Sequence, residues 1–209
     1  MQYAMFLVMR EIRWNSASEV REILSKRLAT EGETFGSNDR FRLHGTNGRQ
    51  IHRLLARMTD YVETRSGMPS RYAEYVHRKG KHGYEVEHIW ADHPERHADE
   101  FPHPSDFEEY RNRIGGLLLL PKSFNASFGD LPYDEKREHY LKQNLLAQCL
   151  HELAYERNPG FLRFVRESGL AFKAHSEFKK ADLDARQELF RRLAEEIWSP
   201  VRLQRELVS

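Results

Sequence analysis

Four consecutive leucines, Leu117–Leu120, stand between the glycine pair Gly115–Gly116 and Pro121. A run that is this short and wholly apolar has the length of a strand and no polar face, so we expect a strand buried on both sides. Pro121 should end it, because proline cannot donate a hydrogen bond to a neighbouring strand. Such a strand has to be enclosed by other elements of the chain.

Most of the remaining sequence has the periodicity of amphipathic helices. Ser105 and Glu108 form a capping-box pattern at the start of one of them. Two runs rich in aromatic and β-branched residues, 72–76 and 84–89, flank a turn that contains glycine and lysine, which indicates a β-hairpin. The apolar start, 1–10, is expected to be a buried element or the trimmed edge of a longer protein. The expected helices lie within 16–32, 46–66, 105–114, 133–157, 160–168 and 179–199. The sequence thus predicts a mostly helical single domain over 1–209 with a small β element in its middle.

Composition excludes several classes of protein. The net charge of +1 gives no broad attraction to polyanions, so any nucleic-acid binding must come from local clusters. A single cysteine, Cys149, excludes disulfide frameworks and multi-cysteine zinc sites. No apolar run approaches the roughly 18 residues that a membrane span needs. We expect no membrane association and a cytoplasmic location.

A carboxylate, a histidine and two asparagines frame the expected strands. Glu87 and His88 lie near the end of the run 84–89, Asn112 precedes the leucine run, and Asn125 follows it. A neutral histidine can accept a proton from water near neutral pH. Carboxylate and amide oxygens can hold a hard divalent cation that polarises a phosphate. This chemistry suits phosphodiester hydrolysis, with Mg²⁺ or Mn²⁺ as the cofactor.

The segments EHIW and RNRIGGLLLLPKSFNASFGDLPYDEK resemble the C-terminal nuclease domain of GmrSD-type modification-dependent restriction enzymes. Within that group the sequence is most similar to the SspE-type effectors of phosphorothioation-based anti-phage defence. The similarity covers about 84–142 and extends loosely back to about residue 46. It implies an α+β fold, mostly α-helical, with an embedded ββα-metal core of the HNH or His-Me finger type.

The resemblance also implies a role for each motif residue. His88 would be the general base, Asn112 would brace the loop between the strands, and Asn125 and Glu87 would bind the metal. The implied activity is metal-dependent nicking of phage or plasmid DNA that leaves a 5′ phosphate and a 3′ hydroxyl. Such domains follow an NTP-hydrolysing, modification-sensing domain, so the chain reads as the C-terminal part of a longer protein. It departs from the family in lacking a proline soon after EHI and in having Gly116 where asparagine is usual.

Several basic residues near the motif are candidates for binding DNA phosphates. They are Arg78, Lys79, Lys81, Lys122, Lys136 and Arg137.

Other interpretations of these residues stay open. Asn125 and Asn112 could simply cap helices, and Glu87 could be a solvated strand residue. A helical DNA-binding or interaction module with a decayed nuclease site would keep the basic groups and lose the chemistry. Three histidines of the loop over 91–105, namely His93, His97 and His103, could instead hold a structural zinc ion.

Overall fold

The computed structural model of the chain describes residues 2–30, 35 and 41–201. Helices make up 61% of it, which confirms the predicted α+β, mostly helical fold class. No helix in the described part of the chain is both long enough and apolar enough to span a bilayer. The elements are α1 (Gln2–Ile12), α2 (Ala17–Thr30), α3 (Gly48–Arg65), α4 (Tyr72–Tyr75), β1 (Tyr84–His88), the 3₁₀ helix η2 (Pro94–His97), α5 (Pro104–Arg111), η3 (Ile114–Gly116), β2 (Leu117–Pro121), α6 (Lys122–Phe128), α7 (Tyr133–Tyr140), α8 (Leu145–Gln148), α9 (Ala154–Arg157), α10 (Pro159–Ser168) and α11 (Lys180–Ile197).

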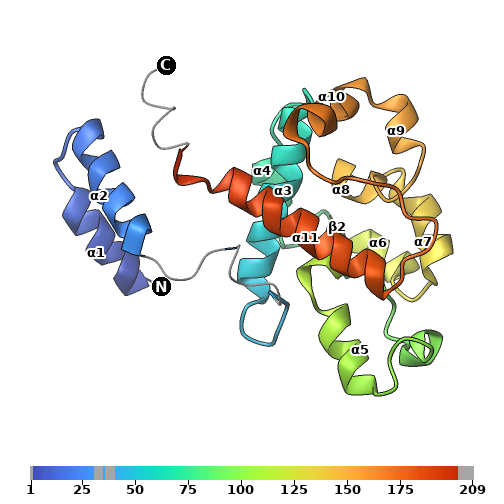
Figure 1. Cartoon of the computed structure of the whole chain (residues 1–209). Coiled ribbons are helices and arrows are strands. Elements are labelled where there is room, and N and C mark those ends of the chain that lie inside the picture. The colour runs from blue at the N-terminus through green and yellow to red at the C-terminus, as the bar shows by residue number, and fades with distance from the viewer. Residues whose placement is uncertain (1, 31–34, 36–40, 202–209) are drawn as a thin grey trace.

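The leucine run forms the inner strand that its composition predicts. β2 pairs with β1 in an antiparallel two-stranded sheet, with Tyr84 opposite Pro121 and His88 opposite Leu117. Each of the four leucines is at most 1% exposed. Helices α3 and α6 contact this sheet, and α11 contacts η3 just before β2. Figure 1 shows the long helices α3 and α11 at the centre of the helical body, where they contact each other.

The predicted hairpin is wrong, because β1 pairs with the leucine strand and the run 72–76 is helical instead. Tyr75 explains the difference. Its side chain is fully buried, donates a hydrogen bond to Glu63 Oε2 at 2.6 Å and packs edge-on against Tyr84 at 5.1 Å. In a helical turn the Tyr75 ring packs into the core. The leucine strand is a more apolar partner for β1 than the run 72–76 would be.

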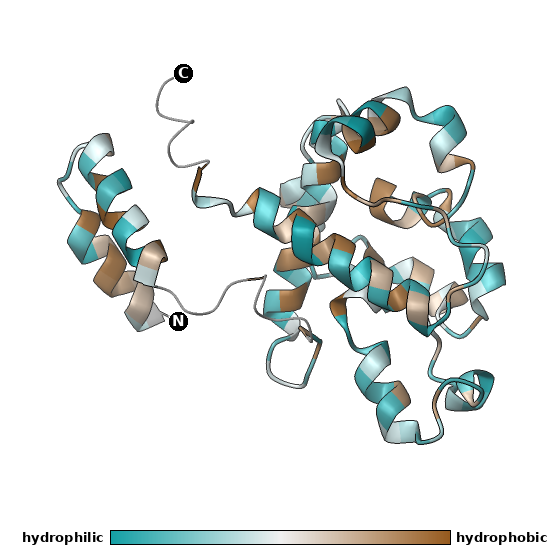
Figure 2. Ribbon diagram, in the orientation of Figure 1, coloured by the Kyte–Doolittle hydropathy of each residue, from teal (hydrophilic) through white to brown (hydrophobic). Residues whose placement is uncertain are grey.

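Helix α3 is the centre of the core. Its buried side chains include Ile51, Leu55, Met58 and Val62, at the helical spacing that the sequence shows. The helix contacts both strands as well as α8, α10 and α11. Figure 2 shows that α5, by contrast, is mostly hydrophilic, in keeping with Phe107 as its buried residue.

Glycines let α11 approach the start of β2 closely. A Cβ atom on Gly115 would lie 2.5 Å from the backbone nitrogen of Gln187, and one on Gly116 would lie 3.2 Å from Leu183 Cδ1. Both distances are too short for ordinary contact. The departure from the family pattern at Gly116 therefore coincides with tight packing of α11.

Other predicted elements differ in detail. The helix expected over 133–157 is divided into α7, α8 and α9, and Asn144 caps α8 by accepting a hydrogen bond from Ala147 N. Helix α5 begins at Pro104 without a side-chain cap, so the predicted capping box at Ser105 is wrong. The apolar start forms α1 as a helix with exposed side chains. Tyr3 is 73% exposed and Phe6 is 59% exposed, so the prediction of a buried element is also wrong.

Candidate active site

His88, the last residue of β1, is held by Asn112 at the end of α5. His88 Nε2 and Asn112 Oδ1 are 2.9 Å apart. The Asn112 amide is oriented by its own nitrogen, because Nδ2 donates to the carbonyl oxygen of Glu108 at 2.9 Å. Its backbone is fixed as well, since Leu43 N donates to Asn112 O at 2.8 Å. The structure thus brings together two of the predicted site residues, 24 positions apart in the sequence.

This arrangement determines which imidazole nitrogen carries the proton. The Oδ1 atom of Asn112 can only accept, so His88 Nε2 must donate to it. In the neutral ring Nδ1 is then the unprotonated nitrogen. Burial lowers the pKa of His88 to about 4, helped by the nearby charge of Arg111 and opposed by Asn112. His88 is therefore neutral at pH 7, with Nδ1 able to accept a proton.

Glu87 forms a buried ion pair with Lys136 of α7. Lys136 Nζ donates to Glu87 Oε1 at 2.7 Å and to the backbone oxygen of His88 at 2.9 Å. Lys136 is 0% exposed and Glu87 is 4% exposed. Burial raises the pKa of Glu87 and lowers that of Lys136, while the attraction between the two opposes both changes. The pair anchors the end of β1 to α7.

Asn125 lies on α6, where its side chain is directed at the backbone of β1. Its Nδ2 donates to the carbonyl oxygen of Val86, two residues before His88, at 3.4 Å. Its Oδ1 is buried, and no described residue donates a hydrogen bond to it. A buried amide oxygen without a donor is costly unless a cation or water occupies the space in front of it. Asn125 is not a helix cap here, because α6 begins three residues earlier, at Lys122.

The donor set fits a hard divalent cation in part. Asn125 Oδ1 is available, whereas Glu87 has Oε1 engaged by Lys136, so Glu87 could offer only Oε2. Within the described residues no three His, Cys, Asp or Glu side chains gather as a metal site. Mg²⁺ commonly takes only one or two protein oxygens and completes its shell with waters and substrate phosphate. A site with few protein ligands is consistent with that preference.

Of the six predicted phosphate-binding residues, four are accessible to DNA and two are already engaged within the protein. Arg78, Lys79 and Lys81 are exposed around the turn before β1, and Lys122 is half-buried at the start of α6. Lys136 is buried in its pair with Glu87 and cannot reach DNA in this structure. Arg137 is bound to Glu152 at 3.0 Å and to the backbone oxygen of His175 at 3.3 Å, so it is already engaged.

The three loop histidines are used in different ways. His93 lies 2.7 Å from Glu95 and 2.9 Å from Asp130. His97 instead packs against the ring of Trp90, with centroids 4.5 Å apart, and His103 is the N-cap residue of α5. The structure does not bring these histidines together, so the zinc alternative is not supported among the described residues.

Two basic residues outside the predicted set lie next to it. Arg49 and Arg53 of α3 line the same hollow as Arg78 and Lys79. Together with Arg57 they recur at every fourth position, which places them on one face of the helix. This four-residue spacing of arginines could have been used to predict a basic helix face from the sequence.

The family model for the C-terminal domain of GmrSD restriction endonucleases matches residues 5–193, which includes every residue of this site. No curated protein and no solved structure matches the chain significantly. The match indicates a nuclease role of the restriction-endonuclease type, with DNA as the substrate. The chain belongs to the family of C-terminal domains of GmrSD restriction endonucleases.

Proposed function

We propose that the chain is a metal-dependent DNA endonuclease of the HNH type in which His88 is the general base. The observation that supports this most strongly is the orientation of His88. Asn112 fixes the proton on Nε2, and burial keeps the ring neutral, so Nδ1 is ready to take a proton. What distinguishes His88 from His52, whose ring is also buried and held by a backbone oxygen, is its position at the end of β1, the strand whose backbone the side chain of Asn125 contacts.

In this proposal the reaction begins when His88 Nδ1 accepts a proton from a water molecule. The resulting hydroxide attacks phosphorus and the bond from phosphorus to the 3′ oxygen breaks. The departing 3′ oxygen takes up a proton from water, which leaves a 5′ phosphate and a 3′ hydroxyl. Asn112 holds the imidazole while it gains charge. Such general-base catalysis contributes typically about 10²–10⁴-fold to the rate.

Asn125 Oδ1, and Glu87 through Oε2, would hold Mg²⁺ or Mn²⁺. Such an ion supplies positive charge that stabilises the departing oxygen. Asn125 is the stronger candidate, because its oxygen has no hydrogen-bond donor among the described residues. Lys136 keeps the Glu87 carboxylate and the end of β1 in place.

One site of this kind cuts one strand, so nicking is the expected elementary event. Arg78, Lys79, Lys81 and Lys122 are the proposed phosphate contacts; Lys136 and Arg137 are left out because both are already bound. A role in anti-phage defence, similarity to SspE-type effectors and a preceding NTP-hydrolysing domain remain predictions that rest on the motif resemblance.

The test is cleavage of supercoiled plasmid with Mg²⁺, Mn²⁺ or EDTA, comparing the wild type with His88→Ala and Asn125→Ala. Thermal melts must show that both variants are folded. We expect metal-dependent conversion to open circles, reduced about 10²–10⁴-fold by His88→Ala. If folded His88→Ala cuts as fast as the wild type, His88 is not the base. A wild type that binds DNA and never cuts it would favour a decayed, binding-only module.

A further inference from the structure

The hollow between α3 and the segment before β1 is lined by basic side chains. It has a volume of about 600 Å³, and Arg49, Arg53, Arg78 and Lys79 contribute to its wall. No ion pair joins any of these four to a carboxylate within the described residues, although many other surface cations are paired, for example Arg71 with Glu74. Unpaired cations around a hollow favour an anionic ligand that carries several charges.

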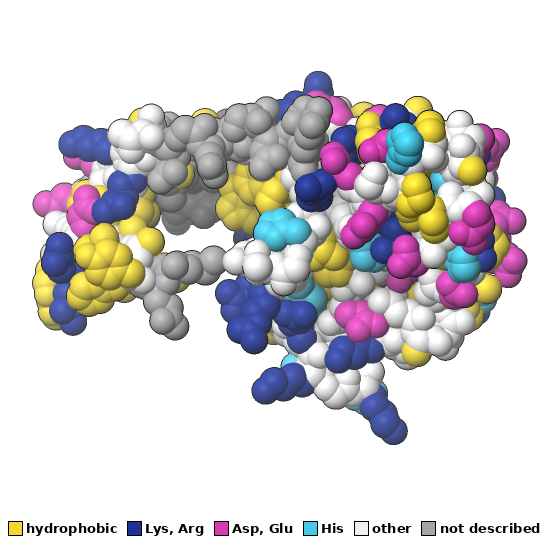
Figure 3. All heavy atoms as spheres, turned by 90° about the horizontal axis from the view of Figure 1, so that it is seen from below, with side chains coloured by type: hydrophobic (Ala, Val, Ile, Leu, Met, Phe, Trp, Pro, Cys, Tyr) yellow, Lys and Arg dark blue, Asp and Glu magenta, His cyan; other side chains and the backbone are white. Residues whose placement is uncertain are grey.

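This basic groove is joined to β1. His52, which also lines it, lies with Nε2 3.1 Å from the backbone oxygen of Tyr84, the first residue of the strand. His88 ends the same strand four residues later, about 13 Å away at roughly 3.3 Å per residue. That separation corresponds to about four base steps along a duplex, at about 3.4 Å per step. Figure 3 shows Lys and Arg side chains gathered near the middle of one face, with Asp and Glu concentrated to one side of it.

A second hollow, of about 520 Å³, lies next to the groove and has a different character. Its wall contains the aromatic residues Phe35, Phe41, Tyr72 and Trp198, together with Leu54. Arg53 lines both hollows, which makes them neighbours. A volume in the range of about 300–1,000 Å³ with mostly apolar walls and a few polar groups is typical of small-molecule sites.

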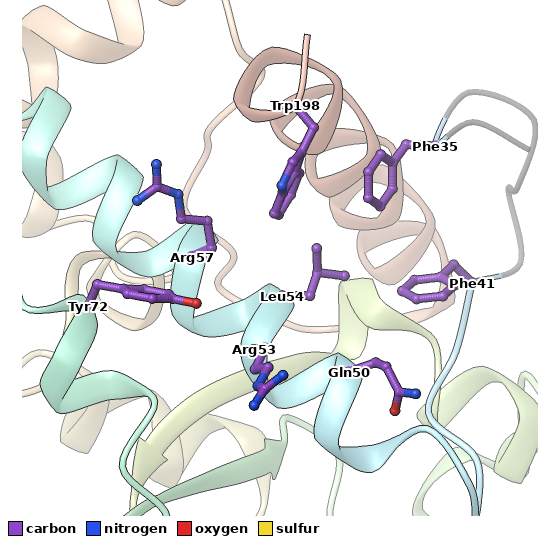
Figure 4. Close-up of a pocket in the computed structure, with 8 residues that line it drawn as sticks. All are labelled: Phe35, Phe41, Gln50, Arg53, Leu54, Arg57, Tyr72 and Trp198. Atoms are coloured by element: carbon purple, nitrogen blue, oxygen red, sulfur yellow. The ribbon is translucent and has the colours of Figure 1, made fainter. Parts of the chain in front are cut away.

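The side chains of this aromatic pocket are arranged for stacking. Phe35 and Trp198 stack on each other, with centroids 5.3 Å apart. Figure 4 shows Trp198 between Phe35 and Arg57, so one face of the indole is covered and the other is turned toward Arg57 and Tyr72. Gln50 and Arg53 stand at the edge with hydrogen-bonding groups. A nucleobase has the matching properties, since it is flat, stacks on aromatic rings and carries polar edges.

We propose that the aromatic pocket takes the base of an unpaired nucleotide while the basic groove holds the backbone phosphates beside it. The inference rests on the proposed function only in taking DNA as the ligand. A base that is already unpaired costs less to bring into such a pocket than one that must leave a duplex. The domain should therefore prefer DNA with an unpaired nucleotide to a perfect duplex.

The first experiment measures binding by fluorescence anisotropy in EDTA, with a labelled perfect duplex and the same duplex carrying one unpaired base. We expect the wild type to bind the second more tightly. Trp198→Ala should reduce that preference about 5- to 150-fold, the range that base–aromatic stacking supports. Trp198→Phe should keep most of it. The matched control is Trp14→Ala, because Trp14 is 92% exposed and does not line the pocket.

The groove is tested by the salt dependence of binding. Arg53→Ala should weaken binding of both DNAs and reduce the slope of log K against log salt concentration by about 0.9 for each phosphate that the protein no longer neutralises. Arg65→Ala is the control, because Arg65 is exposed on the same helix about 18 Å further along it. An unchanged slope in Arg53→Ala would overturn the assignment of the groove.

The base pocket is refuted if the wild type shows no preference, or if folded Trp198→Ala retains it. These results are separate from the nuclease test, because binding is measured in EDTA and cleavage is not measured. A preference that persists in a chain unable to cut would support the pocket and remove the proposed enzyme. Cleavage by a chain that shows no preference for the unpaired base would support the proposed enzyme and refute the base pocket.

Discussion

Replacing Lys136 by methionine should destabilise the fold strongly, and by an amount that depends on pH. The substitution leaves the Glu87 carboxyl buried, at 4% exposure, without its partner at 2.7 Å. Breaking a buried pair by removing one partner costs about 3–5 kcal/mol. The cost is limited because Glu87 can bind a proton. For a carboxyl with an unfolded pKa of about 4.3, protonation at pH 7 costs about 4 kcal/mol, at about 1.4 kcal/mol per pH unit.

The direction of the pH effect follows from the raised pKa of Glu87 in the variant. A carboxyl with a folded pKa above its unfolded pKa gives its full stability below the unfolded value, and that stability is lost as the pH rises. Lys136→Met should therefore lower the free energy of unfolding by about 4 kcal/mol at pH 7 and by only about 1 kcal/mol at pH 5. Urea unfolding followed by circular dichroism, with the wild type measured at both pH values, gives these differences.

The matched control removes both charges. Glu87→Leu combined with Lys136→Met should recover most of the stability, because replacing a buried ion pair with apolar side chains is often neutral or stabilising. The reasoning fails if Lys136→Met costs less than about 1 kcal/mol at pH 7, or if its cost is the same at pH 5 and pH 7.

Two further substitutions test the surroundings of the site. Asn112→Asp places a carboxylate beside His88 Nε2 and should raise the pKa of that ring above its value of about 4. In a plot of log kcat/KM for cleavage against pH, the acidic limb should then move to higher pH. If the limb does not move, the result contradicts the role of His88 as base. Gly115→Ala should lower the free energy of unfolding by about 1–3 kcal/mol or more, because the added Cβ would lie 2.5 Å from Gln187 N. Gly45→Ala is its control, with no atom within 4 Å of the added Cβ, and equal urea midpoints for the two variants would refute the packing argument.

The parts of the fold that could be predicted are those with one physical solution. A run of four leucines has no polar face and the length of a strand, so an inner strand could be predicted, as could helices from the long amphipathic patterns of α3 and α11. The run 72–76 was compatible with two kinds of secondary structure. Its aromatic residues suit a strand or a helical turn, and the contacts of Tyr75 with Glu63 and Tyr84 decided between them.

The candidate site could likewise be predicted only in part from the sequence. The motif resemblance predicted that His88 and Asn112 belong to one site, but it gave Asn112 the role of bracing the loop and not of holding the imidazole. The role of Lys136 could not be predicted, because in the stretch YDEKREHY this residue looks like any solvated basic residue of a charged helix. Its burial depends on a carboxylate 49 positions earlier, and a pairing over that distance leaves no local trace in the sequence.

His88 is held by segments that lie on both sides of it in the sequence. Its ring is oriented by Asn112, whose backbone oxygen is bound by Leu43 N at 2.8 Å. Its backbone oxygen is bound by Lys136, which follows it in the sequence by 48 positions. The proposed general base is therefore held directly by Asn112 and Lys136 and indirectly by Leu43, which precedes the sheet. Because Leu43 lies outside the motif segment 84–142, we expect that the isolated segment orients Asn112, and through it the His88 ring, less firmly than the whole domain does.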